Sequence, residues 1–91
     1  MFSKNMPTIL FIYGWKLYFY SNESKEPIHI HVQKGDAQAK FWIIIDEIEI
    51  TEAFSYNFTL ANKREVKKII YQNFDVIVDA WFNHFLNNNH G

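Results

Sequence analysis

The chain has 91 residues, which is enough for one domain and not for two. Hydrophobic residues make up 48% of it and charged residues 21%, a balance that excludes an intrinsically disordered chain. The absence of cysteine excludes disulfide bonds, thiolate nucleophiles and thiolate metal sites. A formal net charge of −1 gives no overall attraction to nucleic acids or to anionic membranes.

The longest apolar stretch, Ile9 to Tyr20, is too short for a membrane-spanning helix, which needs ~20 residues, and Gly14 and Lys16 interrupt it. The beginning of the chain does not resemble a secretory leader. We therefore expect a cytoplasmic protein without a membrane contact. Its expected organisation is a polar extension over residues 1–5, a single domain over residues 6–86 and a polar tail over residues 87–91.

The segment from Thr8 to Tyr20 is rich in β-branched and aromatic residues and has Tyr13-Gly14 in its middle, which predicts two strands joined by a tight turn. In the second of these strands Trp15, Leu17 and Phe19 share one face. Lys16, Tyr18 and Tyr20 share the other face. The first face is the expected core face, because the second carries the charge.

Three further segments read as extended chain. Residues Ile28 to Gln33 alternate strictly, with His29 and His31 on one face, and Ala37 to Ile45 follow as another strand after a turn at Lys34-Gly35-Asp36. Residues Asp46 to Phe58 are ambiguous, and their acidic half, Asp46 to Glu52, alternates weakly, which fits either a short edge strand or an extended loop.

Residues Thr59 to Leu86 carry apolar side chains at steps of three and four, the pattern of an amphipathic helix. A single helix of roughly 27 residues would be ~40 Å long, and Thr59 or Asn62 would cap its start. The predicted fold is therefore α+β: an antiparallel sheet of four to five strands, built from hairpins and covered by one long C-terminal helix.

His29 and His31 are the first candidate site. Their Cα atoms would lie about 6.6–6.8 Å apart on a strand, with both imidazoles on the same side. That spacing suits a general acid and base, or two ligands of one metal ion. A metal site would need a further ligand, for which Glu23, Glu26 and Asp36 are near in sequence. The alternative is a structural pair of histidines. We predict no cofactor and no resident metal.

Aromatic side chains make up 19% of the chain, and this excess fits both a dense core and a partner-binding surface. Trp15, Phe19, Phe41, Trp81 and Phe85 are predicted to build the core between sheet and helix. Tyr18, Tyr20, Trp42 and Phe82 would lie on faces that one helix does not cover. These four predict a surface for a partner protein, with stacking of single-stranded bases as the alternative.

Basic residues gather at the expected start of the helix, where the helix dipole disfavours cations by a few tenths to ~1 kcal/mol each. They are Lys63, Arg64, Lys67 and Lys68. Pairing with the acidic segment Asp46 to Glu52 would offset this cost. The alternative is contact with a phosphate backbone or an acidic partner.

Several short motifs follow one another along the chain: Met6-Pro7-Thr8-Ile9, Tyr20-Ser21-Asn22-Glu23, Pro27-Ile28-His29-Ile30-His31-Val32, Ala39-Lys40-Phe41-Trp42, and Ala80-Trp81 with Phe85. Together they resemble the bacterial domain of unknown function 4160, from Met6 to about Leu86. Asn83-His84-Phe85 departs from the family, where Glu-Tyr-Phe is expected, and Asp46 to Asn57 matches poorly.

The resemblance implies a small protein that is often encoded beside a partner of the domain-of-unknown-function 2442 type, a pairing commonly interpreted as a toxin–antitoxin module. We expect the protein to bind such a partner, and a homodimer is a further option. The alternative is an RNA-binding or RNA-cleaving toxin in which His29 and His31 act as acid and base. The motif positions carried over are Ser21, Asn22, Glu23, His29, His31, Lys40 and Trp42.

Overall fold

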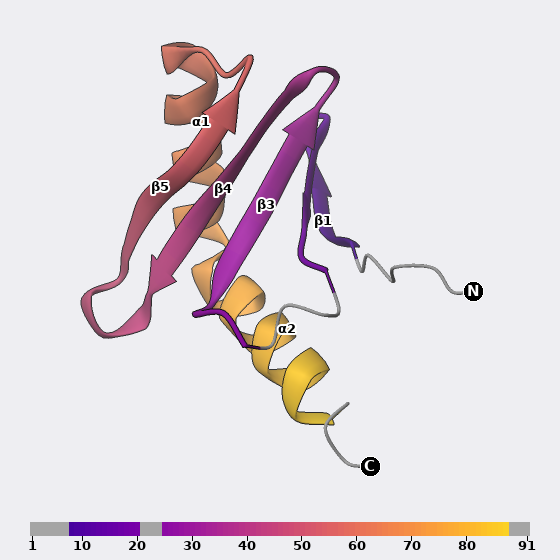
Figure 1. Cartoon of the computed structure of the whole chain (residues 1–91), viewed down its shortest axis with the longest axis vertical. Coiled ribbons are helices and arrows are strands. Elements are labelled where there is room, and N and C mark those ends of the chain that lie inside the picture. The colour runs from indigo at the N-terminus through magenta and orange to yellow at the C-terminus, as the bar shows by residue number, and fades with distance from the viewer. Residues whose placement is uncertain (1–7, 21–24, 88–91) are drawn as a thin grey trace.

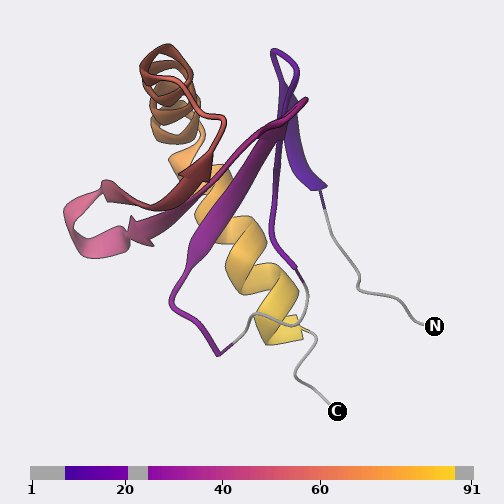
Figure 2. The same ribbon diagram turned by 45° about the horizontal axis from the view of Figure 1, so that its top comes forward.

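The computed structural model describes residues 8–20 and 25–87. Five strands form one antiparallel sheet in sequence order: β1 (Thr8–Ile12), β2 (Trp15–Tyr18), β3 (His29–Lys34), β4 (Ala37–Ile44) and β5 (Glu49–Tyr56). A short 3-10 turn, η1 (Ile45–Glu47), joins β4 to β5, and two helices follow, α1 (Leu60–Gln72) and α2 (Phe74–Asn87). Both helices lie on the same side of the sheet, so the molecule has two layers (Figure 1 and Figure 2).

The predicted strands are confirmed. β1 and β2 form a hairpin around Tyr13 and Gly14, whose φ angles of 51° and 82° match the two positive φ values of the turn that joins twisted strands. The ambiguous segment after Ile45 contains η1 and then β5, an edge strand of eight residues.

β5 contains an irregularity in its pairing with β4. Phe41 lies opposite Glu52 and Lys40 lies opposite Phe54, so Ala53 has no partner on β4 and forms a bulge. The bulge changes the alternation of the strand. Glu52 therefore shares the helix-covered face with Phe41, whereas Phe54 shares the opposite face with Lys40.

The prediction of one long helix is wrong, because the helical segment is interrupted at Asn73. The Asn73 side chain donates a hydrogen bond from Nδ2 to the Ile69 carbonyl at 2.9 Å, and its backbone has φ −118° and ψ 24°, outside the helical range. A side chain that bonds to the carbonyl four residues earlier bends a helix. The chain changes direction here, and α2 runs past the start of β3 (Figure 1).

The core lies between the sheet and the two helices. Val66, Ile69 and Ile70 of α1 and Ile77 and Trp81 of α2 are buried against the sheet. The sheet contributes the alternate residues of β2, β3 and β4, including the predicted core residues Trp15, Phe19 and Phe41.

A hydrogen bond also connects the layers. The buried Trp15 donates from Nε1 to the Glu65 carboxylate of α1 at 3.0 Å, which satisfies an indole group that burial would otherwise leave unpaired.

Neither of the two described helices has the length and the apolar composition that a membrane-spanning helix needs.

Candidate functional site

The face of the sheet opposite to α1 is the candidate site, and we call it the open face. α2 reaches this face at the His29 end, where Trp81 contacts the His29 ring. Directly opposite residues of neighbouring strands lie on the same face. One row of the open face runs across four strands through Tyr18, His31, Lys40 and Phe54. The next row contains Phe11, Lys16, Gln33, Gln38 and Tyr56. A third contains His29, Trp42 and Thr51.

The open face carries large side chains that are exposed to solvent. Phe11 is 74% exposed, Phe54 50% and Tyr56 62%. Trp42 is half-buried in the row that also contains His29. Phe54 and Tyr56 lie on β5, and Phe11 lies on β1 at the opposite edge of the sheet. Exposed aromatic side chains contribute nothing to the core and are typical of an interaction surface.

The structure brings His29 and His31 together, as predicted, with ring centroids 5.1 Å apart. Both side chains are buried. The His29 Nδ1 lies 2.8 Å from the Pro27 carbonyl oxygen, and since a carbonyl only accepts, Nδ1 carries the hydrogen. The His29 ring also contacts Trp42 and Trp81, at centroid distances of 5.6 Å and 4.9 Å. It therefore joins the end of β3 to α2.

His31 belongs to a cluster of aromatic rings. Its ring is stacked on Tyr18 at 5.2 Å with an interplanar angle of 17°, and Tyr20 meets it edge-on at 5.1 Å. Tyr18 and Tyr20 are themselves 5.5 Å apart. General acid–base catalysis requires a ring nitrogen within reach of the substrate. The burial of both histidines and these ring contacts favour a structural role for the pair.

Lys40 is held in place beside the histidine pair. Its ammonium group donates to the Glu26 carboxylate at 2.6 Å and lies 4.4 Å from the centre of the Trp42 ring. The same Glu26 oxygen is 3.8 Å from the Nδ1 of His29. The charge of Lys40 is thus partly neutralised by a neighbour from the loop before β3.

The predicted basic residues do not belong to the open face, because α1 packs on the other side of the sheet (Figure 2). Lys63 forms an ion pair with Glu52 of β5 at 3.2 Å. The expected ion pairing between the basic start of α1 and the acidic segment Asp46 to Glu52 is therefore present for Lys63. The remaining basic residues of the helix start lie in the same layer: Arg64, Lys67 and Lys68.

Of the acidic residues proposed as further metal ligands, the fold brings Glu26 beside His29 but not Asp36. Asp36 lies in the turn after β3, at the end of the strand opposite to His29. In residues 8–20 and 25–87, no group of three or more His, Cys, Asp or Glu side chains could hold a metal ion. Ser21, Asn22 and Glu23 fall outside the described residues.

The four aromatics predicted to be left over have different positions. Tyr18 is buried, Tyr20 and Trp42 are half-buried on the open face, and Phe82 is exposed on α2 in the helix layer. The sequence analysis assigned no face to Phe54 and Tyr56, because their segment was ambiguous. The bulge at Ala53 shifts the alternation just before these two residues.

The family model of DUF4160, a domain of unknown function, matches residues 14–82. The chain belongs to the DUF4160 family. A search of curated proteins and a search of solved structures found no match. The part that matches the DUF4160 model contains β2, β3, β4, β5 and α1, and so most of the open face.

Proposed function

We propose that this DUF4160 protein binds a cognate partner protein through the open face, within a pair of the toxin–antitoxin type whose other member is of the domain-of-unknown-function 2442 type. The observation that carries the proposal is the exposure of Phe11, Phe54 and Tyr56 on the sheet face opposite to α1. Burying such side chains contributes roughly 25 cal/mol per Å² of apolar surface. Aromatic residues are among the commonest energetic centres of protein interfaces.

The charges of the open face favour a protein over RNA. Lys16 and Lys40 are the cations of its described rows, and Lys40 is already paired with Glu26. Binding to a phosphate backbone usually needs several unpaired Lys or Arg side chains along the track of the strand. The burial of His29 and His31 also argues against an RNA-cleaving mechanism that uses these two side chains.

Co-expression with the neighbouring protein of the 2442 type tests the proposal. We expect the two proteins to co-purify, and a Phe54→Ser/Tyr56→Ser variant to bind the partner at least about tenfold more weakly, a loss of ~1.4 kcal/mol. The unfolding midpoint should stay close to that of the wild type, because both side chains are exposed. Leu60→Ser, which changes an exposed apolar residue in the helix layer, is the matched control and should bind normally.

Growth with and without the partner is the second readout. Inhibition by one member that the other relieves, with relief lost in the Phe54→Ser/Tyr56→Ser variant, supports a pair of this type. A wild-type protein that binds single-stranded RNA but not the neighbouring protein would replace this proposal by the RNA-binding alternative. Equal partner binding by the variant and the wild type would exclude the open face.

A further inference from the structure

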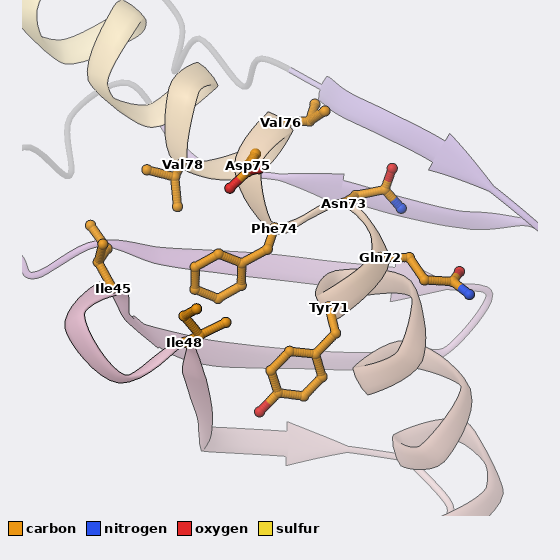
Figure 3. A pocket seen from close by; sticks show the side chains of 9 residues that line it. All are labelled: Ile45, Ile48, Tyr71, Gln72, Asn73, Phe74, Asp75, Val76 and Val78. Atoms are coloured by element: carbon orange, nitrogen blue, oxygen red, sulfur yellow. The ribbon is translucent and has the colours of Figure 1, made fainter.

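The break between α1 and α2 creates a pocket on the side of the molecule away from the open face. Its volume is about 670 Å³, within the range of ligand-binding sites. Tyr71 and Phe74 extend into it from the helix junction, and Ile45 and Ile48 extend from the opposite wall after β4 (Figure 3). The tyrosine and phenylalanine rings are parallel, with an interplanar angle of 8°. Val76 and Val78 add further apolar surface, while Gln72, Asn73 and Asp75 are the polar residues of the lining.

Ile48 is in an unfavourable backbone conformation at the wall of this pocket. Its φ of 50° and ψ of 55° place it in the left-handed region, which a β-branched residue rarely adopts. Its side chain is nevertheless 63% exposed, so packing does little to offset the strain. Strained residues often mark sites of recognition, where a bound partner supplies the contacts that the free protein lacks.

Most of the charged residues next to the pocket lining are acidic, although Lys67 and Lys68 lie one helical turn before Tyr71 and Gln72. Asp46, Glu47 and Glu49 are exposed on one side of it, and Asp75 and Asp79 are exposed on α2. The sequence has no Lys or Arg between residues 41 and 62 or after residue 68. A ligand for this pocket would meet apolar walls and then carboxylates on two separate elements.

We propose that the pocket binds a basic amphipathic segment of a partner protein, which inserts an apolar side chain beside Ile48 and Phe74 and places Lys or Arg side chains near Asp46 and Asp75. This inference rests on the proposed binding of a protein partner but uses a different surface from the open face. Apolar anchors with surrounding charge complementarity are a recurrent mode of helix and peptide recognition.

The test uses a synthetic amphipathic helix with Leu on one face and Lys and Arg on the other. We expect saturable binding by fluorescence anisotropy and backbone amide shifts confined to η1, Ile48 and the α1–α2 junction. A peptide with Glu in place of the basic residues, and one with Ser in place of Leu, should each bind at least about tenfold more weakly. Equal binding of all three peptides, or no binding, would overturn the inference.

Ile48→Asn separates recognition from folding, because Asn tolerates the left-handed conformation better than Ile. We expect a higher melting temperature and at least about tenfold weaker peptide binding. A lower melting temperature with unchanged binding would mean that Ile48 is only structural and would refute the assignment.

Asp75→Asn should weaken the peptide and reduce the salt dependence of its binding, while Asp36→Asn, at the distant turn after β3, should do neither. Self-association that Ile48→Asn abolishes would identify a second copy as the occupant and overturn the basic segment. Phe54→Ser/Tyr56→Ser should leave peptide binding unchanged, so a failure of this inference and a failure of the open-face proposal are distinguishable.

Discussion

His29 shows how one buried polar side chain can connect the two layers of a small protein. Its Nδ1 hydrogen is used by the Pro27 carbonyl, and its ring lies between Trp42 of the sheet and Trp81 of α2. Truncation would remove the hydrogen bond and leave a cavity among aromatic rings that cannot collapse easily. These contacts explain the presence of a histidine at position 29 by its structural role, without a catalytic one.

His29→Ala should lower the free energy of unfolding by about 2–4 kcal/mol, the usual cost of a lost buried hydrogen bond together with a new cavity. Urea unfolding followed by tryptophan fluorescence measures the change. Gln33→Ala, a half-buried position on the same strand, is the control and should cost far less. An unchanged His29→Ala midpoint would contradict the role as a link between the layers.

The sequence predicts that His29 and His31 lie on the same side of the strand, but it does not predict that they are buried. Strict alternation from Ile28 to Gln33 is a local property and places His29 and His31 on one side. The burial of His29 depends partly on Trp81, a contact between residues far apart in sequence. No local pattern indicates which ring of a distant helix will meet a strand.

At the scale of elements, α1 begins with a complete capping box. The Thr59 hydroxyl accepts from the Asn62 N–H at 3.0 Å, and the Asn62 side chain accepts from the Thr59 N–H at 3.0 Å. This cap supports a helix that begins with basic residues rather than with the acidic residues that the helix dipole prefers. The ion pair between Lys63 and Glu52 contributes little by comparison, because it is partly exposed.

Thr59→Ala should destabilise the protein by about 1–2 kcal/mol, since it leaves helix N–H groups without their partner. Thr59→Ser keeps the hydroxyl and should retain most of the stability. Thermal unfolding followed by circular dichroism compares the two variants. An equal loss in both would show that the methyl group, and not the cap, carries the effect.

Regular elements could be predicted, and the irregular ones could not. The β1–β2 turn and the capped helix start each have a local signal, at Tyr13-Gly14 and at Thr59. The helix break at Asn73 lies inside an unbroken apolar stripe, so periodicity continues across it. The sequence around β5 is ambiguous because η1 precedes the strand and the bulge at Ala53 interrupts the alternation by which a strand is recognised.

At the scale of the molecule, the sheet has an edge at β5 that must be protected from pairing with other chains. Its sequence contains neither Lys nor Pro, the residues most often used for this purpose. Two other devices protect it. The bulge at Ala53 disrupts the ladder, and the Tyr71 hydroxyl of α1 accepts a hydrogen bond from the Ile50 N–H at 3.2 Å.

Deletion of Ala53 should therefore increase self-association. The shortened strand keeps Phe54 opposite Lys40 and Glu52 opposite Phe41, so the fold and the faces are preserved while the edge becomes regular. We expect sedimentation velocity to show dimers or larger species at concentrations where the wild type shows fewer. Ala53→Ser retains the bulge and should behave as the wild type, and a deletion variant with no greater association would show that the bulge does not protect the edge.

Tyr71 contributes to two sites. Its ring lines the pocket at the helix junction, and its hydroxyl oxygen accepts a hydrogen bond from the Ile50 N–H. Any occupant that moves this ring changes the hydrogen bond at the sheet edge, and any chain that takes the Ile50 N–H releases the ring into the pocket. The two surfaces are thus coupled by one side chain. The exchange rate of the Ile50 backbone amide would report, in solution, whether the pocket at the helix junction is filled.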